Sequence, residues 1–328
     1  MEIITPQGLM SRFTPRARRA VIVVAGVIIL LLVLLLIPGV RDRIATWWLA
    51  LSAPEAVREF TLIEGHSRHV GGTLARIEGA GITRQEEENT LIMDHEKRGD
   101  AEFAITRTIS PASVNVVALT PEARTYVSDE NLKSGLSVSM DGKWALYATL
   151  PNSVVDGDVM YFSNPSMWRV MLLDLTTGDV RQIAEGASPA FLNPEDPTQV
   201  LYMSESGLVV HNTATGESAP TNIPAGTENT PFILSDDGKY LALYSTLLNE
   251  YALFEVYSTD PIFAIRPLRD LGAAYRHIAF SGSTLYGLRQ VAGGKMEVVS
   301  HDLASPAPKL ASVVTFPGSM TLIGFETN

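Results

Sequence analysis

The longest uninterrupted apolar segment runs from Ala20 to Ile37, where eighteen successive residues carry no charge, amide or hydroxyl group. A helix of this length spans roughly 27 Å, close to the ~30 Å hydrocarbon core of a bilayer, and satisfies its own backbone hydrogen bonds. We therefore predict a single transmembrane helix over residues 20–40, between a basic tail at 1–19 and a juxtamembrane linker at 41–59. A cleaved signal peptide is the alternative, but its apolar region is usually shorter and ends at a small-x-small site.

Arginine residues flank this segment asymmetrically, with four before it and two after it. The excess on the N-terminal side predicts a cytoplasmic N-terminus, a single pass through the plasma membrane and an extracytoplasmic C-terminal domain. In the linker, an apolar helical stripe contains two indole rings, which favour the membrane–water interface. This stripe fits either a helix lying on the membrane or a continuation of the anchor past Pro38. The residues expected at the membrane interface are Arg16, Arg18, Arg19, Trp47 and Trp48.

From about Phe60 onward the pattern changes to short β-rich runs separated by Gly, Pro, Asn and Asp. This pattern is typical of an all-β domain, and it extends over residues 60–328. Some runs alternate polar and apolar residues, whereas others are continuously apolar, as expected for strands that are covered on both faces. The early candidate strands are Thr73–Ile77, Thr90–Asp94, Ala101–Thr108 and Val114–Ala118.

A repeated motif organises this domain. The segment Ser139–Tyr147 (SMDGKWALY) returns as Ser235–Tyr244 (SDDGKYLALY), and looser copies end at Tyr202 and Tyr286. The four Tyr are separated by 55, 42 and 42 residues, and an insertion at about Pro151–Ser166 explains the longer first interval. Self-similarity at this period indicates a repeat architecture.

A second repeated element alternates with the first. The hairpin Arg169–Ile183 turns through Thr-Thr-Gly and returns as Leu208–Glu217. Each unit thus contains an inner strand pair joined by an Asp-Gly turn and an outer pair joined by a Thr-Gly turn. Four strands in roughly 42 residues predict the blade of a β-propeller. We expect about six four-stranded blades, with five or seven possible, and ring closure by the last strand, Met320–Phe325.

These motifs carry a family resemblance. The pattern S-x-D-G-K, followed about 25–30 residues later by D-L-T-T-G, resembles the Asp-Gly-Lys class of β-propeller repeats, to which the periplasmic C-terminal domain of TolB belongs. The resemblance covers about residues 110–310. It implies a TolB-like propeller and points toward a protein-interaction module of a bacterial cell envelope, although a fold does not determine a function.

Charge and cysteine content narrow the possible partners. The net charge is −11, and because residues 1–40 contain four Arg and one Glu, residues 41–328 carry −14. Such an acidic domain argues against nucleic acid as a partner. The chain has no Cys, so neither disulfides nor thiol chemistry contribute.

The candidate chemistry is sparse. Asp141 and Asp237 could supply carboxylates to a metal, but Asp-Gly is a tight-turn dipeptide and the structural interpretation is stronger. His66 and His69, together with the Asp94-His95 pair, resemble parts of a metal site without a convincing ligand spacing. No G-x-S-x-G, H-E-x-x-H or Gly-rich phosphate loop occurs. We therefore assign no catalytic residue, metal or cofactor.

The insertion is the best candidate for a partner-binding loop, because insertions into repeats tend to gather on one face, which is often the binding face. Folding of this loop over its own blade is the alternative. The first hypothesis for function is a membrane-anchored scaffold that binds other envelope proteins. The second is a hydrolase, lyase or binding protein acting on cell-surface polysaccharide, with His and carboxylates converging on the central channel. The partner-binding candidates are Met160, Tyr161, Phe162 and Trp168.

Overall fold

The computed structural model describes residues 59–65, 70–78, 81–85, 88–151, 164–224, 232–235, 237–245, 250–258, 264–268, 275–305, 311–317 and 322–327. The chain divides into two units, Met1–Ala56 and Val57–Asn328, and all the described residues belong to the second. The predicted tail, transmembrane helix and linker, with Arg16, Arg18, Arg19, Trp47 and Trp48, lie outside the described residues. No helix in the described ranges is long and apolar enough to cross a membrane.

The described domain is all-β, as predicted. Beside its strands it contains one turn of 3₁₀ helix, η3 (Pro165–Met167). The first sheet has the order β24-β1-β2-β4-β5-β6-β7, with β3 paired to β2. Its strands are β1 (Glu59–Gly65), β2 (Gly72–Glu78), β3 (Gly81–Gln85), β4 (Thr90–Arg98), β5 (Ala101–Thr108), β6 (Ser113–Thr120), β7 (Arg124–Asp129) and β24 (Leu322–Thr327).

Four further sheets have four strands each, and neighbouring strands are antiparallel. Their strands are β8 (Leu132–Val138), β9 (Trp144–Leu150), β10 (Arg169–Asp174), β11 (Val180–Glu185), β12 (Ala187–Asn193), β13 (Asp196–Ser204), β14 (Gly207–Asn212), β15 (Ser218–Pro224), β16 (Phe232–Leu234), β17 (Tyr240–Ser245), β18 (Glu250–Ser258), β19 (Ala264–Pro267), β20 (His277–Ser281), β21 (Thr284–Val291), β22 (Lys295–Asp302) and β23 (Ala311–Pro317).

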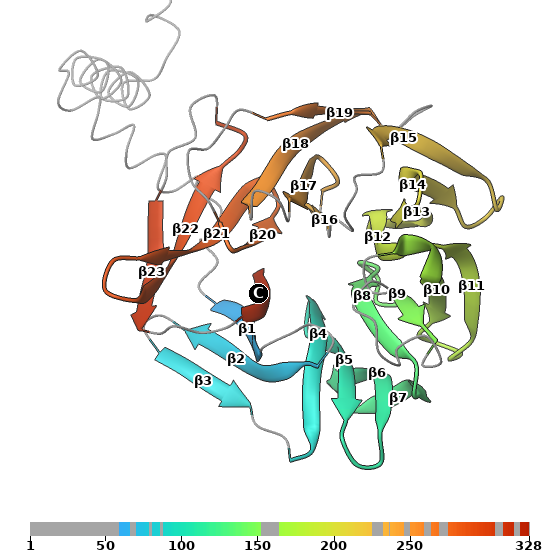
Figure 1. The fold of residues 1–328 in the computed structure, drawn as a ribbon, viewed down its shortest axis with the longest axis horizontal. Coiled ribbons are helices and arrows are strands. Elements are labelled where there is room, and N and C mark those ends of the chain that lie inside the picture. The colour runs from blue at the N-terminus through green and yellow to red at the C-terminus, as the bar shows by residue number, and fades with distance from the viewer. Residues whose placement is uncertain are drawn as a thin grey trace, which may run out of the picture. The chain divides into compact units, whose positions relative to one another are not determined.

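The sheets stand around a common centre, the arrangement of a β-propeller (Figure 1). Strands β4, β8, β12, β16, β20 and β24 lie nearest the centre, and the last strand of each four-stranded group lies at the rim. The eight-stranded sheet has two halves, β24-β1-β2-β3 and β4–β7, which are joined by the pair Gly72–Ile92. We call them the first and second half-sheets. The last strand pairs with β1, from Phe60–Thr327 to Glu64–Leu322, so the predicted ring closure by the C-terminal strand is confirmed.

The Asp-Gly motif forms the same turn in both of its clear copies. The Ser139 hydroxyl donates to Asp141 Oδ1 over 2.7 Å and accepts from the Trp144 backbone N–H over 3.0 Å. In the second copy the Ser235 hydroxyl makes the matching bonds to Asp237 and Tyr240 over 2.8 and 2.9 Å. The Gly residue has φ +66° in both turns, a conformation that glycine adopts without strain. The interpretation of these Asp as turn residues is therefore confirmed.

Apolar side chains fill the space between neighbouring sheets. A separate buried cluster lies at each junction within the described domain, for example Phe60 and Phe325 against Tyr286, between the first half-sheet and the β20–β23 sheet. The junction between the two half-sheets has the smallest such cluster, with Ile63, Leu74, Ile92 and Ala104 as its buried members. Polar groups occupy much of the remaining junction, as described below.

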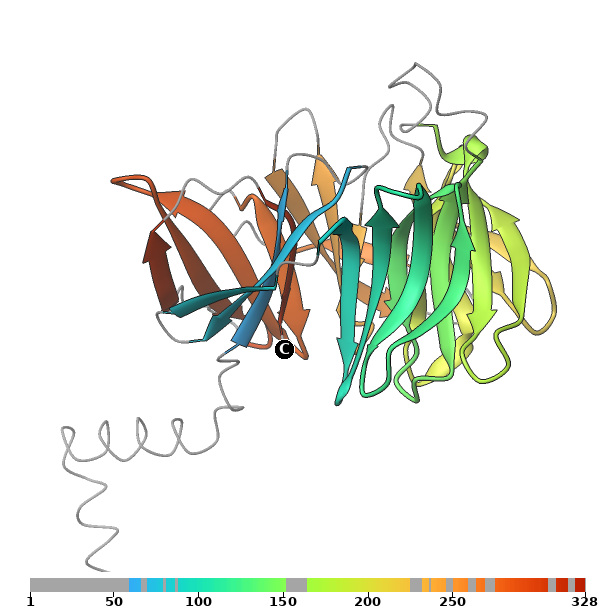
Figure 2. The same ribbon diagram turned by 90° about the horizontal axis from the view of Figure 1, so that it is seen from below.

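The strand directions define two ends of the ring. Glu59 begins β1 and lies 3.9 Å from Lys97 near the end of β4, whereas Gly72 and the start of β4 lie at the opposite end. We call these the Glu59 end and the Thr90 end. Strand β8 runs in the same direction as β4, and β9 is antiparallel to β8, so the connection from Leu150 to Arg169 lies at the Thr90 end. The strand ends on either side of the insertion, Leu150 and Arg169, therefore lie at the end opposite to Glu59 (Figure 2).

Candidate functional site

Strand β4 carries a run of charged residues, DHEKR, next to the centre of the ring. Their contacts go to both sides. Asp94, Glu96 and Arg98 contact β8, whereas His95 contacts β24. This division follows from the alternation of side chains along a strand. We call the two sets of contacts the β8 seam and the β24 seam.

In the β8 seam, carboxylates of β4 bind backbone N–H groups of the neighbouring sheet. The Gly135 and Leu136 N–H groups both donate to Asp94 Oδ2 over 2.9 Å. Strand β8 changes register between Ser134 and Ser137, and Gly135 has φ +70° there. A bulge leaves N–H groups out of the β ladder, and Asp94 accepts from two of them.

Glu96 and Arg98 complete this seam at the end of β8. Glu96 Oε2 accepts from the Val138 N–H and Arg98 Nε donates to the Val138 carbonyl, both over 3.0 Å. The two side chains also form an ion pair with each other. Burial raises the pKa of Glu96 to about 8, although the charge of Arg98 acts in the opposite direction.

In the β24 seam, His95 lies between two carboxylates. Its Nδ1 is 2.7 Å from Glu326 Oε2 on the C-terminal strand, and its Nε2 is 3.6 Å from Glu102 Oε2 on β5. Arg76 from β2 donates to the same Glu102 oxygen over 2.5 Å. The row Arg76–Glu102–His95–Glu326 thus crosses the junction between the two half-sheets twice.

His95 is 2% exposed, and burial by itself would lower the pKa of its imidazole. The charges of Glu326 and Glu102 outweigh burial and raise this pKa to about 9. Correspondingly, the His95 imidazole lowers the pKa of Glu102, whereas burial raises the pKa of Glu326. Both carboxylates therefore favour the protonated form of His95, and the row of contacts joins β24, β4 and β5.

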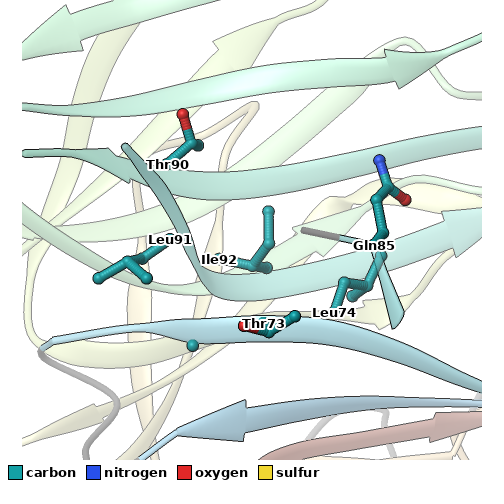
Figure 3. A pocket seen from close by; sticks show the side chains of 7 residues that line it. Thr73, Leu74, Gln85, Thr90, Leu91 and Ile92 are labelled. Atoms are coloured by element: carbon teal, nitrogen blue, oxygen red, sulfur yellow. The ribbon is translucent and has the colours of Figure 1, made fainter. Parts of the chain in front are cut away.

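A cavity of about 230 Å³ opens at the Thr90 end, where β3 ends and β4 begins (Figure 3). Its lining is aliphatic and neutral polar: Gly72, Thr73, Leu74, Gln85, Thr90, Leu91 and Ile92. Two exposed apolar residues lie beside it. Ile109, 58% exposed, donates its N–H to the Asn89 carbonyl over 3.0 Å, and Val70, 49% exposed, precedes the turn that enters β2.

The structure describes only some of the site residues predicted from the sequence. Met160, Tyr161 and Phe162 lie outside the described residues. The structure places Trp168 in the core between β4–β7 and β8–β11, where it is 2% exposed. His66 and His69 also lie outside the described residues, and no group of three His, Asp or Glu within the described ranges is placed to hold a metal ion.

Sequence reasoning missed the two seams. The sequence pattern presents Asp94 and His95 only as part of a metal site, and it gives no reason to select Glu96, Glu102 or Glu326. The available signal was five charged or ionisable residues in succession on a strand of a propeller, where both faces are covered. Such residues require partners on both neighbouring sheets.

The sequence matches no family model and no curated protein. Among solved structures, the chain is similar to TolB from Acinetobacter baumannii, with a TM-score of 0.59 and 14% identity over 85% of this chain and 69% of that chain. It is also similar to a chain in the nidogen/laminin complex, with a TM-score of 0.52 and 11% identity over 82% of this chain and 97% of that chain. Likeness at these identities shows the fold alone. The chain is thus a β-propeller of TolB-like fold, as the repeats predicted.

Proposed function

We propose that this protein is a membrane-anchored, extracytoplasmic protein-interaction module of a bacterial cell envelope. The observation that carries the proposal is the opposition of the two ends of the ring. The first described strand begins at the Glu59 end, whereas the cavity, the exposed Ile109 and Val70, and the strand ends on either side of the insertion belong to the Thr90 end. A tether at one end leaves the other end available to partners.

The use of the charged groups supports binding over catalysis. His95 is buried, and Asp94, Glu96 and Glu102 each bond to a neighbouring strand or to an arginine. These contacts assign the ionisable groups near the ring's centre to holding sheets together, so they do not favour the alternative of a polysaccharide-acting enzyme. A similar structure is a complex of two proteins, nidogen and laminin, which agrees with a protein partner.

The finer features of the proposal follow from the sequence and the strand order. If each half-sheet counts as one blade, the ring has six blades, with β24 as the inner strand of the first. Residues 20–40 form the anchor, with Arg16, Arg18, Arg19, Trp47 and Trp48 at the membrane interface. Met160, Tyr161 and Phe162 of the insertion contribute to the partner surface.

The test compares two exposed apolar residues at opposite ends. Ile109 is 58% exposed at the Thr90 end, and Met140 is 48% exposed in the Asp-Gly turn at the Glu59 end. Full-length Ile109→Asp and Met140→Asp proteins are isolated from gently solubilised native membranes, and co-purified proteins are quantified by mass spectrometry. We expect stoichiometric envelope proteins with wild type and Met140→Asp, and their loss with Ile109→Asp, because a charge in an apolar interface core is unfavourable.

A third protein lacking residues 152–163 tests the insertion. Loss of the same partners would support the proposal that the insertion belongs to the partner-binding surface. Equal recovery with Ile109→Asp and Met140→Asp would contradict the choice of face, and a protein that is recovered alone in every case would refute the interaction function. Extraction of the wild-type protein from membranes by alkaline wash would separately refute the anchor.

A further inference from the structure

The C-terminal strand is held in the ring by two kinds of contact. Its backbone pairs with β1 from Phe60–Thr327 to Glu64–Leu322, and Phe325 stacks on Phe60 with ring centroids 5.6 Å apart. On the opposite side, Glu326 meets His95 of β4 over 2.7 Å. This ion pair links β24 directly to the second half-sheet, at the junction that has the smallest apolar cluster.

Charged groups from every neighbouring strand surround His95. Glu326 comes from β24, Glu102 from β5 and Arg76 from β2. From β4 itself, Asp94 is bound by the β8 N–H groups, Glu96 is paired with Arg98, and Lys97 lies 3.9 Å from Glu59 of β1. With His95 protonated, the row Arg76–Glu102–His95–Glu326 contains two positive and two negative charges.

Loss of the proton from His95 removes this balance. Glu326 and Glu102 then face a neutral imidazole. Arg76 still contacts Glu102, whereas the remaining cation that acts on Glu326 is Arg98 of β4, which is itself paired with Glu96. An unpaired carboxylate in a partly desolvated junction is unfavourable, and movement of β24 away from β4 would give Glu326, whose side chain is 29% exposed in the closed ring, fuller access to water. The strand that closes the ring is also the strand that carries this carboxylate.

We propose that ring closure is proton-linked: protonated His95 latches Glu326 and keeps β24 in the ring, and deprotonation in alkaline medium releases the strand. Release of β24 is a local opening that is confined to one strand.

The direction of the pH dependence follows from the protonation equilibrium of His95. The pKa of His95 is raised from 6.5 to about 9 in the folded protein, so the latch is fully present below the unfolded value and is lost as the pH rises through about 9. The latch therefore favours closure at neutral pH and release at alkaline pH.

The test is hydrogen exchange of the full-length protein in detergent, expressed as protection factors that are corrected for the intrinsic effect of pH. Between about pH 6 and pH 9.5 we expect protection of β24 to fall at least about tenfold, while β13 stays unchanged. Glu326→Gln keeps a hydrogen-bonding group but leaves no carboxylate to become unpaired when His95 loses its proton, so β24 protection should be lower than in the wild type at pH 6 and nearly independent of pH. His95→Gln should reduce β24 protection at pH 6 and abolish its pH dependence.

Lys143→Gln is the control, because it removes a positive charge from an exposed turn in another sheet, away from the latch. It should leave the pH profile of β24 as in the wild type. The proposal is overturned by constant protection of β24 over this range, by an equal fall in β13, which would indicate global unfolding, or by an unchanged pH profile in His95→Gln.

Discussion

Replacing the serine of the Asp-Gly motif by alanine tests whether the repeat signature is structural. Ser139 is fully buried and Ser235 is 1% exposed, and each hydroxyl joins an Asp carboxylate to a backbone N–H. Ser→Ala removes both bonds at once. In Ser139→Ala the exposed Asp141 carboxylate can bind water instead, but the Trp144 N–H at the start of β9 loses its hydrogen-bond partner. An unsatisfied N–H of this kind lowers the free energy of unfolding by about 1–3 kcal/mol.

We therefore expect each substitution to destabilise the domain by about 2 kcal/mol, and the double variant by about 4 kcal/mol, because the two turns lie in separate sheets and share no partner. For a domain of this size, 1 kcal/mol corresponds to roughly 2–4 °C in Tm. Thermal unfolding followed by circular dichroism should show falls of about 4–8 °C for each single variant and about twice that for the double.

Ser206→Ala is the control, because Ser206 is exposed and bonds to Ser204 within a turn. Its Tm should change by less than about 1 °C. Single-variant shifts as small as that of the control would refute the structural role of the motif. A Tm that rises on addition of calcium, and does so only with both Asp intact, would instead revive the metal interpretation.

Three other predictions concern buried groups. Lys133 is 1% exposed, and its Nζ donates to Val114 O, Asn131 O and Asp129 Oδ1. Lys133→Met should therefore lower the free energy of unfolding in urea by about 2 kcal/mol, and Lys133→Ala should lower it further because it also leaves a cavity. Equal losses in the two variants would contradict the packing argument. A Cβ at Gly72 would lie 2.0 Å from Glu64 O, so Gly72→Ala should lower the yield of folded protein or reduce Tm by several degrees. The control is Gly99→Ala, where the space around the Cβ is open and only about 1 kcal/mol of backbone strain is expected. Burial lowers the pKa of His211 and His301, so in this pH range the unfolded chain binds protons to these two groups more readily than the folded protein does. Between about pH 7 and pH 5.5, the Tm of the wild type should therefore fall relative to the Tm of the His211→Gln/His301→Gln double variant, and a constant difference between the two would refute this assignment.

The repeat could be predicted from the sequence because its information is local. The turns at Ser139 and Ser235 are formed within a few residues by Asp, Gly and a hydroxyl, so the motif itself specifies the hydrogen bonds. The same holds for the outer hairpins, where Asp174 and Asn212 cap their own turns. Strand order then follows from alternating hairpins.

The seams could not be predicted, because their partners are distant in the sequence. Glu326 lies 231 residues from His95, and Arg76 lies 26 residues from Glu102. Which of many acidic residues meets His95 depends on ring closure and on the register between β24 and β1. A bulge in β8 in turn makes available the two backbone N–H groups that Asp94 binds.

The pairing of β1 with β24 also determines how the domain would carry mechanical load. A pull on a tether attached before Glu59, resisted by a partner at the Thr90 end, acts along the axis of β1. Because β1 is hydrogen bonded to β24 on one side and to β2 on the other, the bonds of both ladders share that load in shear and do not open one by one. The same strand that closes the ring thus reinforces the point where force enters it.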